Sequence, residues 1–379
     1  MAIPLTLGET VSVGGKPALG SRLDPALSAY LDILRIAAAL TVFLVHCALF
    51  WRPEAFQTLT PVAHGTVVVF FVLSGYVVAY ATASKKRDLK HYIAARLSRL
   101  YSVVAPALIL TAAVEGIGRL LNPHFYERFS RGLETVRYLA TAFFLQNVWH
   151  QSAAPRTNGP FWSLSYEFWY YVIFGAAVFA RGWVRKVALA AAVMLIAGPN
   201  ILLLLPCWLL GVGLYYWRER LRLPRSGAFA VFAVAFLALM IAIVRLPEYP
   251  FPAGSAAFWY SSAFVSDWIL ALVVGLTIAA FDAMRCPPPA RAIATAIRHC
   301  ADHTFSLYLY HFPLLAFATA IAKTDVWPWW KAAIAGSSVL AIVVALGLIT
   351  EGLRPRWQRL FERVLQADAR AGEGRNGGR

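Results

Sequence analysis

Long hydrophobic runs alternate with short polar segments along almost the whole chain. Ten of these runs approach the ~20 residues that an α-helix needs to cross ~30 Å of hydrocarbon. No stretch between them is long enough to hold a separate soluble domain. The pattern therefore predicts an all-α polytopic membrane protein with about ten transmembrane helices. The expected spans are residues 33–51, 62–82, 98–118, 162–180, 184–198, 200–217, 228–246, 263–282, 304–322 and 331–353.

The segments outside the spans define the expected domains. We expect residues 1–29 to be a disordered cytoplasmic tail, residues 30–353 to form the membrane domain, and residues 354–379 to be a basic cytoplasmic tail. The first tail lacks a basic region followed by an apolar core, so a cleaved signal peptide is not expected. An apolar stretch at residues 138–145 is too short to cross alone. We expect residues 133–150 to form a re-entrant or interfacial element on the outer side.

The basic residues determine the expected orientation. The chain has 35 Lys and Arg against 19 Asp and Glu, a net charge of +16, but these cations fall between spans and not along one soluble face. Nucleic acid is therefore not an expected partner. If residues 133–150 stay outside and the N-terminus is cytoplasmic, cytoplasmic segments hold 25 Lys and Arg and outer segments hold 9. If that stretch crosses, the count becomes 12 inside and 22 outside, against the positive-inside rule. We therefore expect both termini in the cytoplasm.

Composition agrees with a membrane protein and adds one exclusion. Hydrophobic residues make up 59% of the chain and charged residues only 14%. The four cysteines stand singly, without CxxC spacing or a Cys/His cluster. We therefore expect neither a disulfide framework nor a metal site.

The first span carries two ionisable residues on one face. Arg35 and His46 are eleven positions apart, which is ~20° from a whole number of helical turns and a rise of ~16 Å. Ionisable groups inside a bilayer are costly, so each is a candidate functional residue. The structural alternative is that Arg35 snorkels to the inner headgroups, paired with Asp32, and that His46 is an interfacial histidine.

Polar positions near the second and third spans have both structural and functional interpretations. Ser74 and Gly75 close an apolar run and suit close helix packing. Arg96 and Arg99, three residues apart, share one face at the cytoplasmic mouth of the third span. They are able to clamp a polyphosphate through bidentate hydrogen bonds, and positive-inside anchoring explains them equally well.

Two later spans contain ionisable residues well inside the apolar run. Glu167 lies more than one turn into its helix without a neighbouring base, so it should face the bundle interior and find a partner there. His311 is two residues before Pro313 near mid-membrane, which predicts a kinked helix with a buried imidazole.

Taken together, these segments resemble the acyltransferase-3 family of membrane acyltransferases over about residues 30–350. Ser102 and Phe168 depart from the family pattern, which often has Pro and a second Glu at these positions, and no appended hydrolase-like domain is seen. The likeness rests on five motifs in the family's order: Arg-x10-His at Arg35–His46, Phe-Phe-x-x-Ser-Gly at Phe70–Gly75, Arg-x-x-Arg at Arg96–Arg99, Trp-Ser-Leu-x-x-Glu at Trp162–Glu167 and Tyr-Leu-x-His-x-Pro at Tyr308–Pro313.

The resemblance implies an enzyme of the bacterial inner membrane. Acyl-CoA, typically acetyl-CoA, would bind from the cytoplasm, and a hydroxyl of a carbohydrate such as an exopolysaccharide or lipopolysaccharide would accept the acyl group. Besides these two substrates, membrane lipids are the only expected partners. By the resemblance the site residues are His46 and Glu167 for catalysis, Arg35, Arg96 and Arg99 for the donor, and Trp162, Ser163, Tyr310 and His311 for substrate binding.

The chemistry leaves alternatives open. A sugar hydroxyl is a poor nucleophile, so His46 would act as general base, with Glu167 orienting the imidazole or holding the acceptor. A covalent acyl-histidine intermediate is a second route. The rival function is a transporter or flippase of a lipid-linked sugar that uses Arg35, Glu167 and His311 as a relay. Transporters commonly contain internal repeats, and the two halves of this chain show none that is convincing.

Overall fold

The computed structural model describes residues 23–84, 88–130, 132–218, 220, 223–324 and 326–376, without the side chains of residues 53–58 and 367–376. Within these residues all regular elements are helices and no β-strand forms, which confirms the all-α class. The helices are α1 Pro25–Trp51, α2 Pro53–Ala83, α3 Leu89–Leu121, α4 Pro123–Glu127, α5 Glu134–Ala142, η1 Arg156–Phe161, α6 Trp162–Phe179, α7 Trp183–Ala197, α8 Pro199–Trp217, α9 Arg225–Arg245, α10 Phe264–Met284, α11 Arg291–Asp302, α12 Thr304–Ala322, α13 Trp329–Gly352 and α14 Arg354–Asn376.

Each of the ten expected spans is helical, and among the described residues eight helices are long and apolar enough to cross a membrane. The exceptions are α6 and α7, which cover the expected spans 162–180 and 184–198. Helix α7 has only 15 residues, or ~22 Å. Helix α6 has 18 residues, among them several Tyr and Trp and the carboxylate of Glu167. Because α6 and α7 are consecutive, the expected side of every later segment is the same whether or not both cross.

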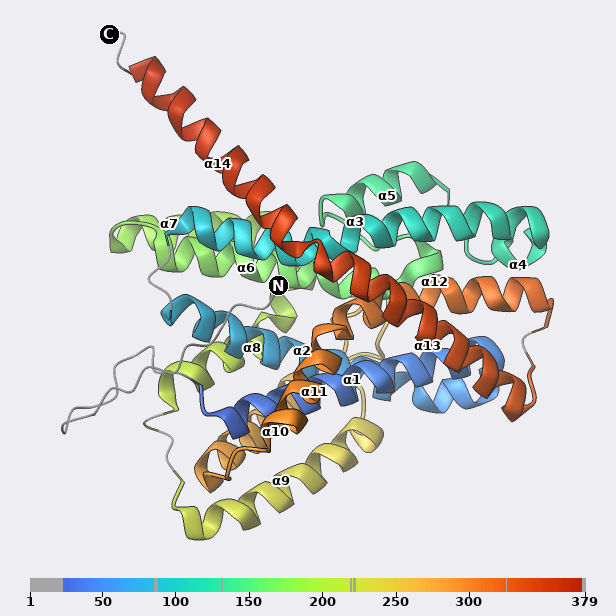
Figure 1. Cartoon of the computed structure of the whole chain (residues 1–379), viewed down its shortest axis with the longest axis horizontal. Helices are drawn as coiled ribbons and strands as arrows, with labels where there is room; N and C mark the ends of the chain where they lie inside the picture. The colour runs from blue at the N-terminus through green and yellow to red at the C-terminus, as the bar shows by residue number, and fades with distance from the viewer. Residues whose placement is uncertain are drawn as a thin grey trace.

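The two ends of the membrane domain differ from the expected boundaries. Helix α1 starts at Pro25, because Asp24 accepts hydrogen bonds from the backbone N–H groups of Ala26 and Leu27. The expected disordered tail lies mostly on residues 1–22, outside the described residues. The expected basic tail at 354–379 is helical as far as Asn376 (Figure 1), and the first turns of this helix pack against α3.

A short element packs where residues 133–150 were expected to re-enter. Helix α5 has nine residues, ~14 Å, which is too short to cross. The buried carboxylate of Glu115 on α3 holds this region, because its Oε2 accepts hydrogen bonds from Tyr138 Oη at 3.0 Å and Thr157 Oγ1 at 2.6 Å. Arg119 pairs with the other oxygen of Glu115 at 2.6 Å.

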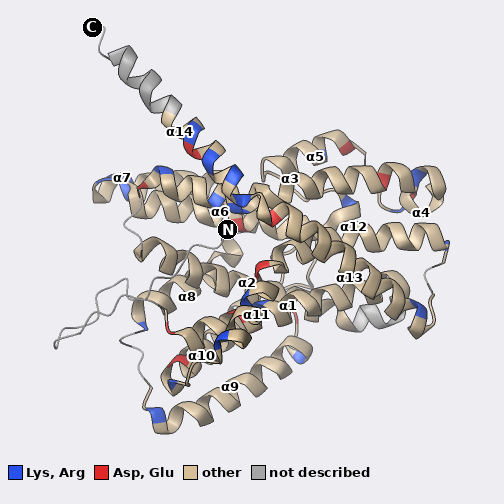
Figure 2. Cartoon of the chain, viewed as in Figure 1, with Lys and Arg blue, Asp and Glu red and all other residues tan. Residues whose placement is uncertain are grey.

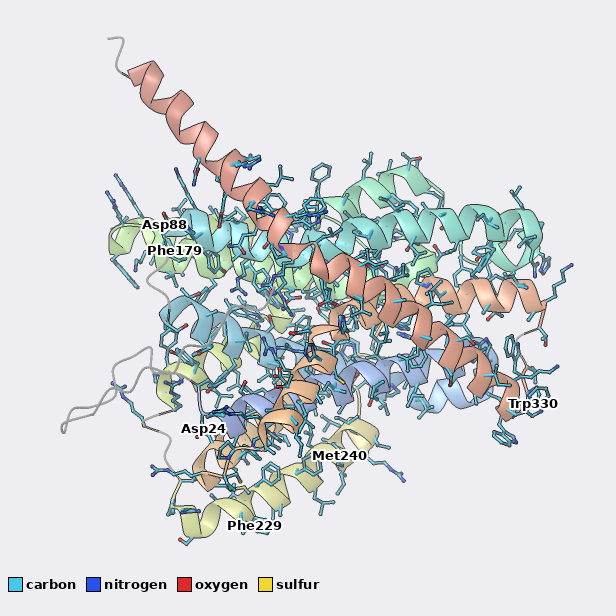
Figure 3. The ribbon with its side chains drawn as sticks, in the orientation of Figure 1. Asp24, Asp88, Phe179, Phe229, Met240 and Trp330 are labelled. Carbon is cyan, nitrogen blue, oxygen red and sulfur yellow. The ribbon has the colours of Figure 1, made fainter. Side chains whose placement is uncertain are left out.

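The bundle is built around α2 and α12. Helix α2 packs against α1 and α8, and α12 packs against α1, α3 and α13. A Cβ atom on Gly75 would lie 2.0 Å from the carbonyl oxygen of Trp208, so the expected close approach of backbones at Gly75 is confirmed, with α8 as the neighbour. Asp24, Asp88 and Phe179 lie toward one end of the molecule and Trp330 at the opposite end (Figure 3).

The charged side chains follow the helix ends. In Figure 2 the middle parts of the long helices are mostly uncharged, and Lys and Arg gather at helix termini and along α14. Helix α9 lies on the periphery with an arginine at each end, Arg225 and Arg245. This arrangement matches the solvation of a helix bundle in a bilayer.

Candidate active site

Two histidines from distant parts of the chain meet inside the bundle. The Nδ1 atom of His46 on α1 lies 2.8 Å from the Nε2 atom of His311 on α12. Their rings are nearly parallel, with centroids 5.1 Å apart. Phe312 lies edge-on to the His46 ring at 5.0 Å. The two histidines that the sequence singled out separately therefore form one pair.

The hydrogen bonds define the tautomers of this pair. His311 Nδ1 lies 2.6 Å from the carbonyl oxygen of Leu307, and a carbonyl only accepts, so Nδ1 of His311 donates. In the neutral ring Nε2 of His311 must then accept, and Nδ1 of His46 donates to it. The chain of bonds leaves Nε2 of His46 with its lone pair.

Proline shapes the helix that carries His311. Pro313 has no N–H, so the carbonyl of Leu309, four residues earlier, loses its partner within the helix. Asn158 from η1 replaces it, because its Nδ2 donates to Leu309 O at 2.9 Å. The amide nitrogen also lies 3.0 Å from Thr111 Oγ1 on α3. The backbone hydrogen bond that is missing at Pro313 is thus replaced by one from Asn158, which links the segment before α6 to α3 and α12.

A separate small cavity is lined by polar residues from all five motifs. It has a volume of about 60 Å³ and lies between α1, α2, α3, α6 and α12. Neither His46 nor His311 lines it, but the ring of Tyr308 does, and that ring lies 6.5 Å from His311. The polar side chains that line the cavity are Arg35, Ser74, Arg99, Ser163, Glu167, Thr304 and Tyr308.

Glu167 finds its partners on α2 and on its own helix. Its Oε1 accepts a hydrogen bond from Ser74 Oγ at 2.9 Å and another from the hydroxyl of Tyr171. Trp208 Nε1 donates to the same Ser74 oxygen at 3.2 Å. Glu167 is therefore half-buried and has partners within the bundle as expected, but the residue that bonds to the His46 ring is His311.

Arg35 is held by the partner expected for it. Asp32 Oδ1 lies 3.7 Å from Arg35 Nη1, and Oδ2 of the same carboxylate lies 3.2 Å from Nη1 of Arg298 on α11. The guanidinium of Arg35 lines the cavity and interacts electrostatically with Glu167. Arg35 thus lies between two carboxylates and does not point out to the headgroups.

Arg99 lines the same cavity, whereas Arg96 does not. The Arg99 guanidinium lies 5.8 Å from the ring centre of Phe305. Arg96 lies over the ring of Tyr171 at 5.5 Å. Arg354, at the start of the segment expected to be a tail, interacts electrostatically with both arginines. Arg354 was not predicted as a site residue, because it lies outside all five motifs.

Comparison with known proteins identifies the family. The acyltransferase domain family matches residues 28–348, nearly the whole membrane domain. The chain belongs to this family of acyltransferases. It is also similar to a protein named O-acetyl transferase from Shigella phage Sf6, with 30% identity over 154 residues. That match covers 39% of this chain and 45% of the phage protein, so this chain matches less than half the length of that relative. No solved structure matches the chain.

The remaining expected substrate residues of the acyltransferase lie in different surroundings. Ser163 lines the cavity and its Oγ lies 2.8 Å from Tyr308 Oη. The Trp162 ring stacks with Tyr260 at 4.5 Å between ring centres, and it is nearly parallel to the ring of His64. Tyr310 donates to Thr350 Oγ1 on α13 at 3.0 Å and does not line the cavity. Ser163 is thus the one of these three that borders the cavity.

One hydrogen-bonded pair of ionisable residues in the acyltransferase was not predicted from the sequence. His64 Nε2 lies 3.0 Å from Asp267 Oδ1, and the His64 ring lies 5.8 Å from Trp162. The two residues stand in separate spans, α2 and α10, and neither belongs to a motif. Each of the two is an ionisable residue within an expected span, and this feature could have marked them as candidates. Among the described residues, no group of three or more His, Cys, Asp or Glu side chains is placed to hold a metal ion.

Proposed function

We propose that this acyltransferase moves an acetyl or similar short acyl group from acyl-CoA to a hydroxyl of a carbohydrate, with His46 as general base. The hydrogen-bonded chain from Leu307 O through His311 to His46 is the observation that carries this proposal. It supplies a neutral imidazole whose Nε2 is ready to accept a proton.

The proposed step uses this nitrogen twice. His46 Nε2 removes the hydroxyl proton while the hydroxyl oxygen attacks the thioester carbonyl. The carbon–sulfur bond then breaks, and the departing CoA thiolate receives the proton from the imidazolium. His311 keeps the ring of His46 oriented and accepts a stronger hydrogen bond as positive charge develops. A positioned base of this kind contributes ~10²- to 10⁴-fold in rate.

The residues that line the small cavity support the expected binding site for the acyl-CoA donor. Arg35 and Arg99 line it, and guanidinium groups bind phosphate oxygens through two parallel N–H groups. Arg35 lies ~16 Å along α1 from His46, a distance that a pantetheine arm is long enough to span. Tyr308 connects the two regions, because it lines the cavity and lies beside His311. In this proposal Glu167 balances the two arginines and does not activate the base.

The identities of the acyl group and of the acceptor are inferred from the family and from one relative. The phage protein's name, O-acetyl transferase, supports acetyl transfer to oxygen. We infer acetyl-CoA as donor, an exopolysaccharide or lipopolysaccharide sugar as acceptor, and the bacterial inner membrane as location. The transporter alternative gains no support from the family match.

Mass analysis of surface glycans tests the function. A strain without this protein should lack one O-linked acyl group on a surface glycan, and the wild-type gene should restore it. The His46→Ala protein should not restore it, whereas His124→Gln, a change at an exposed histidine on α4, should. Glycans that keep all their acyl groups in the deletion strain would contradict a carbohydrate acceptor.

A further inference from the structure

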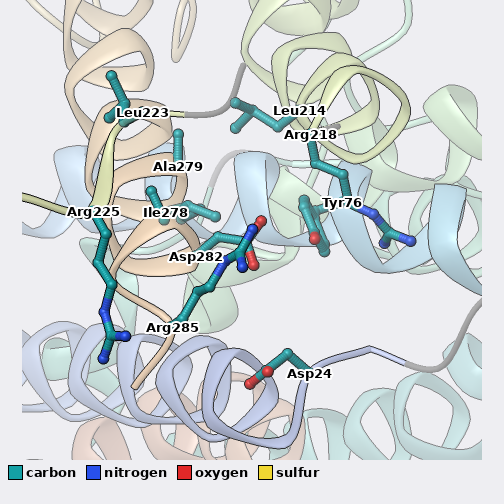
Figure 4. Close-up of a pocket in the computed structure, with 11 residues that line it drawn as sticks. Asp24, Tyr76, Leu214, Arg218, Leu223, Arg225, Ile278, Ala279, Asp282 and Arg285 are labelled. Carbon is teal, nitrogen blue, oxygen red and sulfur yellow. The ribbon is translucent and has the colours of Figure 1, made fainter. Parts of the chain in front are cut away.

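A second and larger cavity lies on the other side of α2. It has a volume of about 510 Å³ and is lined by the start of α1 and by α2, α8, α9 and α10 (Figure 4). Arg225 lies on one side and Tyr76 and Arg218 on the other, with Asp282 and Arg285 between them. Ile278 and Ala279 supply an apolar part of the wall.

This cavity is distinct from the one that holds Arg35 and Arg99. Ser74 lines the small cavity and Tyr76 lines the large one. Two positions along an α-helix are ~200° apart, so these side chains leave α2 on opposite faces. The two cavities share no lining residue. A ligand in the large cavity would therefore be separate from the part of the donor that is held near Arg35.

The charge of the large cavity favours an anion. Within the described part of the chain, no carboxylate lies within ion-pair distance of Arg225 or Arg285. Arg218 lies 4.6 Å over the ring of Tyr215. Of the two acidic residues in the wall, Asp24 already accepts two backbone hydrogen bonds as the cap of α1. Two guanidinium groups are thus free to bind phosphate oxygens.

The cavity also adjoins the exposed apolar surface of α9. It lies at the end of the molecule where α1 begins, which is the expected cytoplasmic end. Its wall includes Arg225, the first residue of α9, whose following residues are apolar and exposed, such as Phe229 at 67% and Leu237 at 62%. Basic pockets between transmembrane helices at this level bind phospholipid headgroups.

We propose that this cavity binds the phosphate headgroup of an anionic phospholipid whose acyl chains lie along α9. Arg225 and Arg285 hold the phosphate, and the buried side chain of Tyr76 lines the same cavity. This site does not depend on the catalytic role proposed for His46.

Native mass spectrometry of the full-length protein in detergent tests the site. Dioleoylphosphatidylglycerol should bind more tightly than dioleoylphosphatidylcholine to the wild-type protein. The double variant Arg225→Gln and Arg285→Gln should bind phosphatidylglycerol ~30-fold more weakly, because each cation near a lipid phosphate contributes about fivefold. Arg245→Gln, at the opposite end of the same helix, is the matched control and should bind like wild type. Thermal unfolding without added lipid verifies that each variant is folded, and the single Arg285→Gln variant replaces the double variant if the latter is not.

Three results would overturn the proposal. The first is equal phosphatidylglycerol binding by a folded double variant and the wild type. The second is displacement of the lipid by millimolar inorganic phosphate, which would mean a site for free phosphate. The third is a loss of CoA binding in the double variant with lipid binding intact, which would assign the cavity to the donor. Acyl transfer that depends on His46 is a separate measurement, so its failure would leave this result unchanged.

Discussion

The histidine pair differs from a Ser-His-Asp arrangement because, among the described residues, no carboxylate is hydrogen-bonded to it. A backbone carbonyl, Leu307 O, takes the last position in the chain of hydrogen bonds. A carbonyl carries only a partial charge, and burying it costs less than burying an ionised carboxylate. The pair therefore gives a base of defined orientation without a charged hydrogen-bond partner.

The orientation of His46 by His311 gives the first prediction. His311→Ala should lower the rate of acyl transfer by ~10²-fold while leaving donor binding unchanged, because the His46 ring loses its hydrogen bond. His311→Gln should retain more activity, since its side-chain oxygen accepts from His46 Nδ1. Combined with His46→Gln, the alanine change should cause little further loss. Transfer rates of the purified variants measure this, and additive losses would contradict a shared role.

Arg99 provides a prediction about the donor. Arg99→Lys keeps the charge but loses the planar pair of N–H groups, so the KM for acyl-CoA should rise ~10-fold with a smaller change in kcat. Arg245→Lys, on the exposed end of α9, is the control. An unchanged KM in the Arg99 variant would leave Arg99 with the anchoring role alone.

At the scale of elements, the tightest contact joins α2 to α8. A Cβ on Gly75 would lie 2.0 Å from Trp208 O, and one on Gly211 would lie 2.0 Å from Val72 O. The two helices thus approach each other through reciprocal glycines. Ser74 lies at this contact and positions Glu167, so the packing of α2 also shapes the small cavity.

Alanine substitution tests this contact. Gly75→Ala should destabilise the protein by ~1–3 kcal/mol, because backbone must move to admit the methyl group. Gly116→Ala on α3 has nothing within 4 Å of the new Cβ and should leave stability unchanged or slightly raised. Thermal unfolding in detergent compares the two, and equal stability of both variants would refute the close contact.

Hydrophobic periodicity predicted the helices well and their limits less well. It located all ten long segments, because an apolar run of this length has one stable form in a bilayer. It did not indicate that the Tyr and Trp side chains of α6 fill an interior face. It missed the regular structure of α14, because charged residues masked an apolar stripe in which Trp357 and Phe361 pack on Tyr101.

For the molecule as a whole, the sequence indicated candidate site residues and one local partner, Asp32 for Arg35, but none of the distant partners. Glu167 was expected to have a buried partner, and the fold supplies Ser74 and Tyr171. The contact between His46 and His311 spans 265 residues, which periodicity does not report. The pair of His64 and Asp267 was missed for the same reason.

The orientation in the membrane remains a prediction from charge. Reporter fusions after Lys86, Arg222 and Arg298 should report the cytoplasm, and a fusion after Gly159 should report the outer side. The first two positions lie outside the described residues. A cytoplasmic signal from the Gly159 fusion would overturn the orientation.

The rate of acyl transfer by the His46→Gln variant tests whether His46 is the general base. Glutamine keeps a hydrogen-bonding side chain without the basicity of imidazole, so the variant should fold, bind acyl-CoA like wild type, and transfer acyl groups at least ~10²-fold more slowly. His124→Gln, at an exposed position, should transfer at the wild-type rate. The measurement is the rate at which labelled acetyl groups move from acetyl-CoA to glycan in proteoliposomes. A rate close to wild type in a folded, donor-binding His46→Gln protein would contradict the role of His46 as the general base.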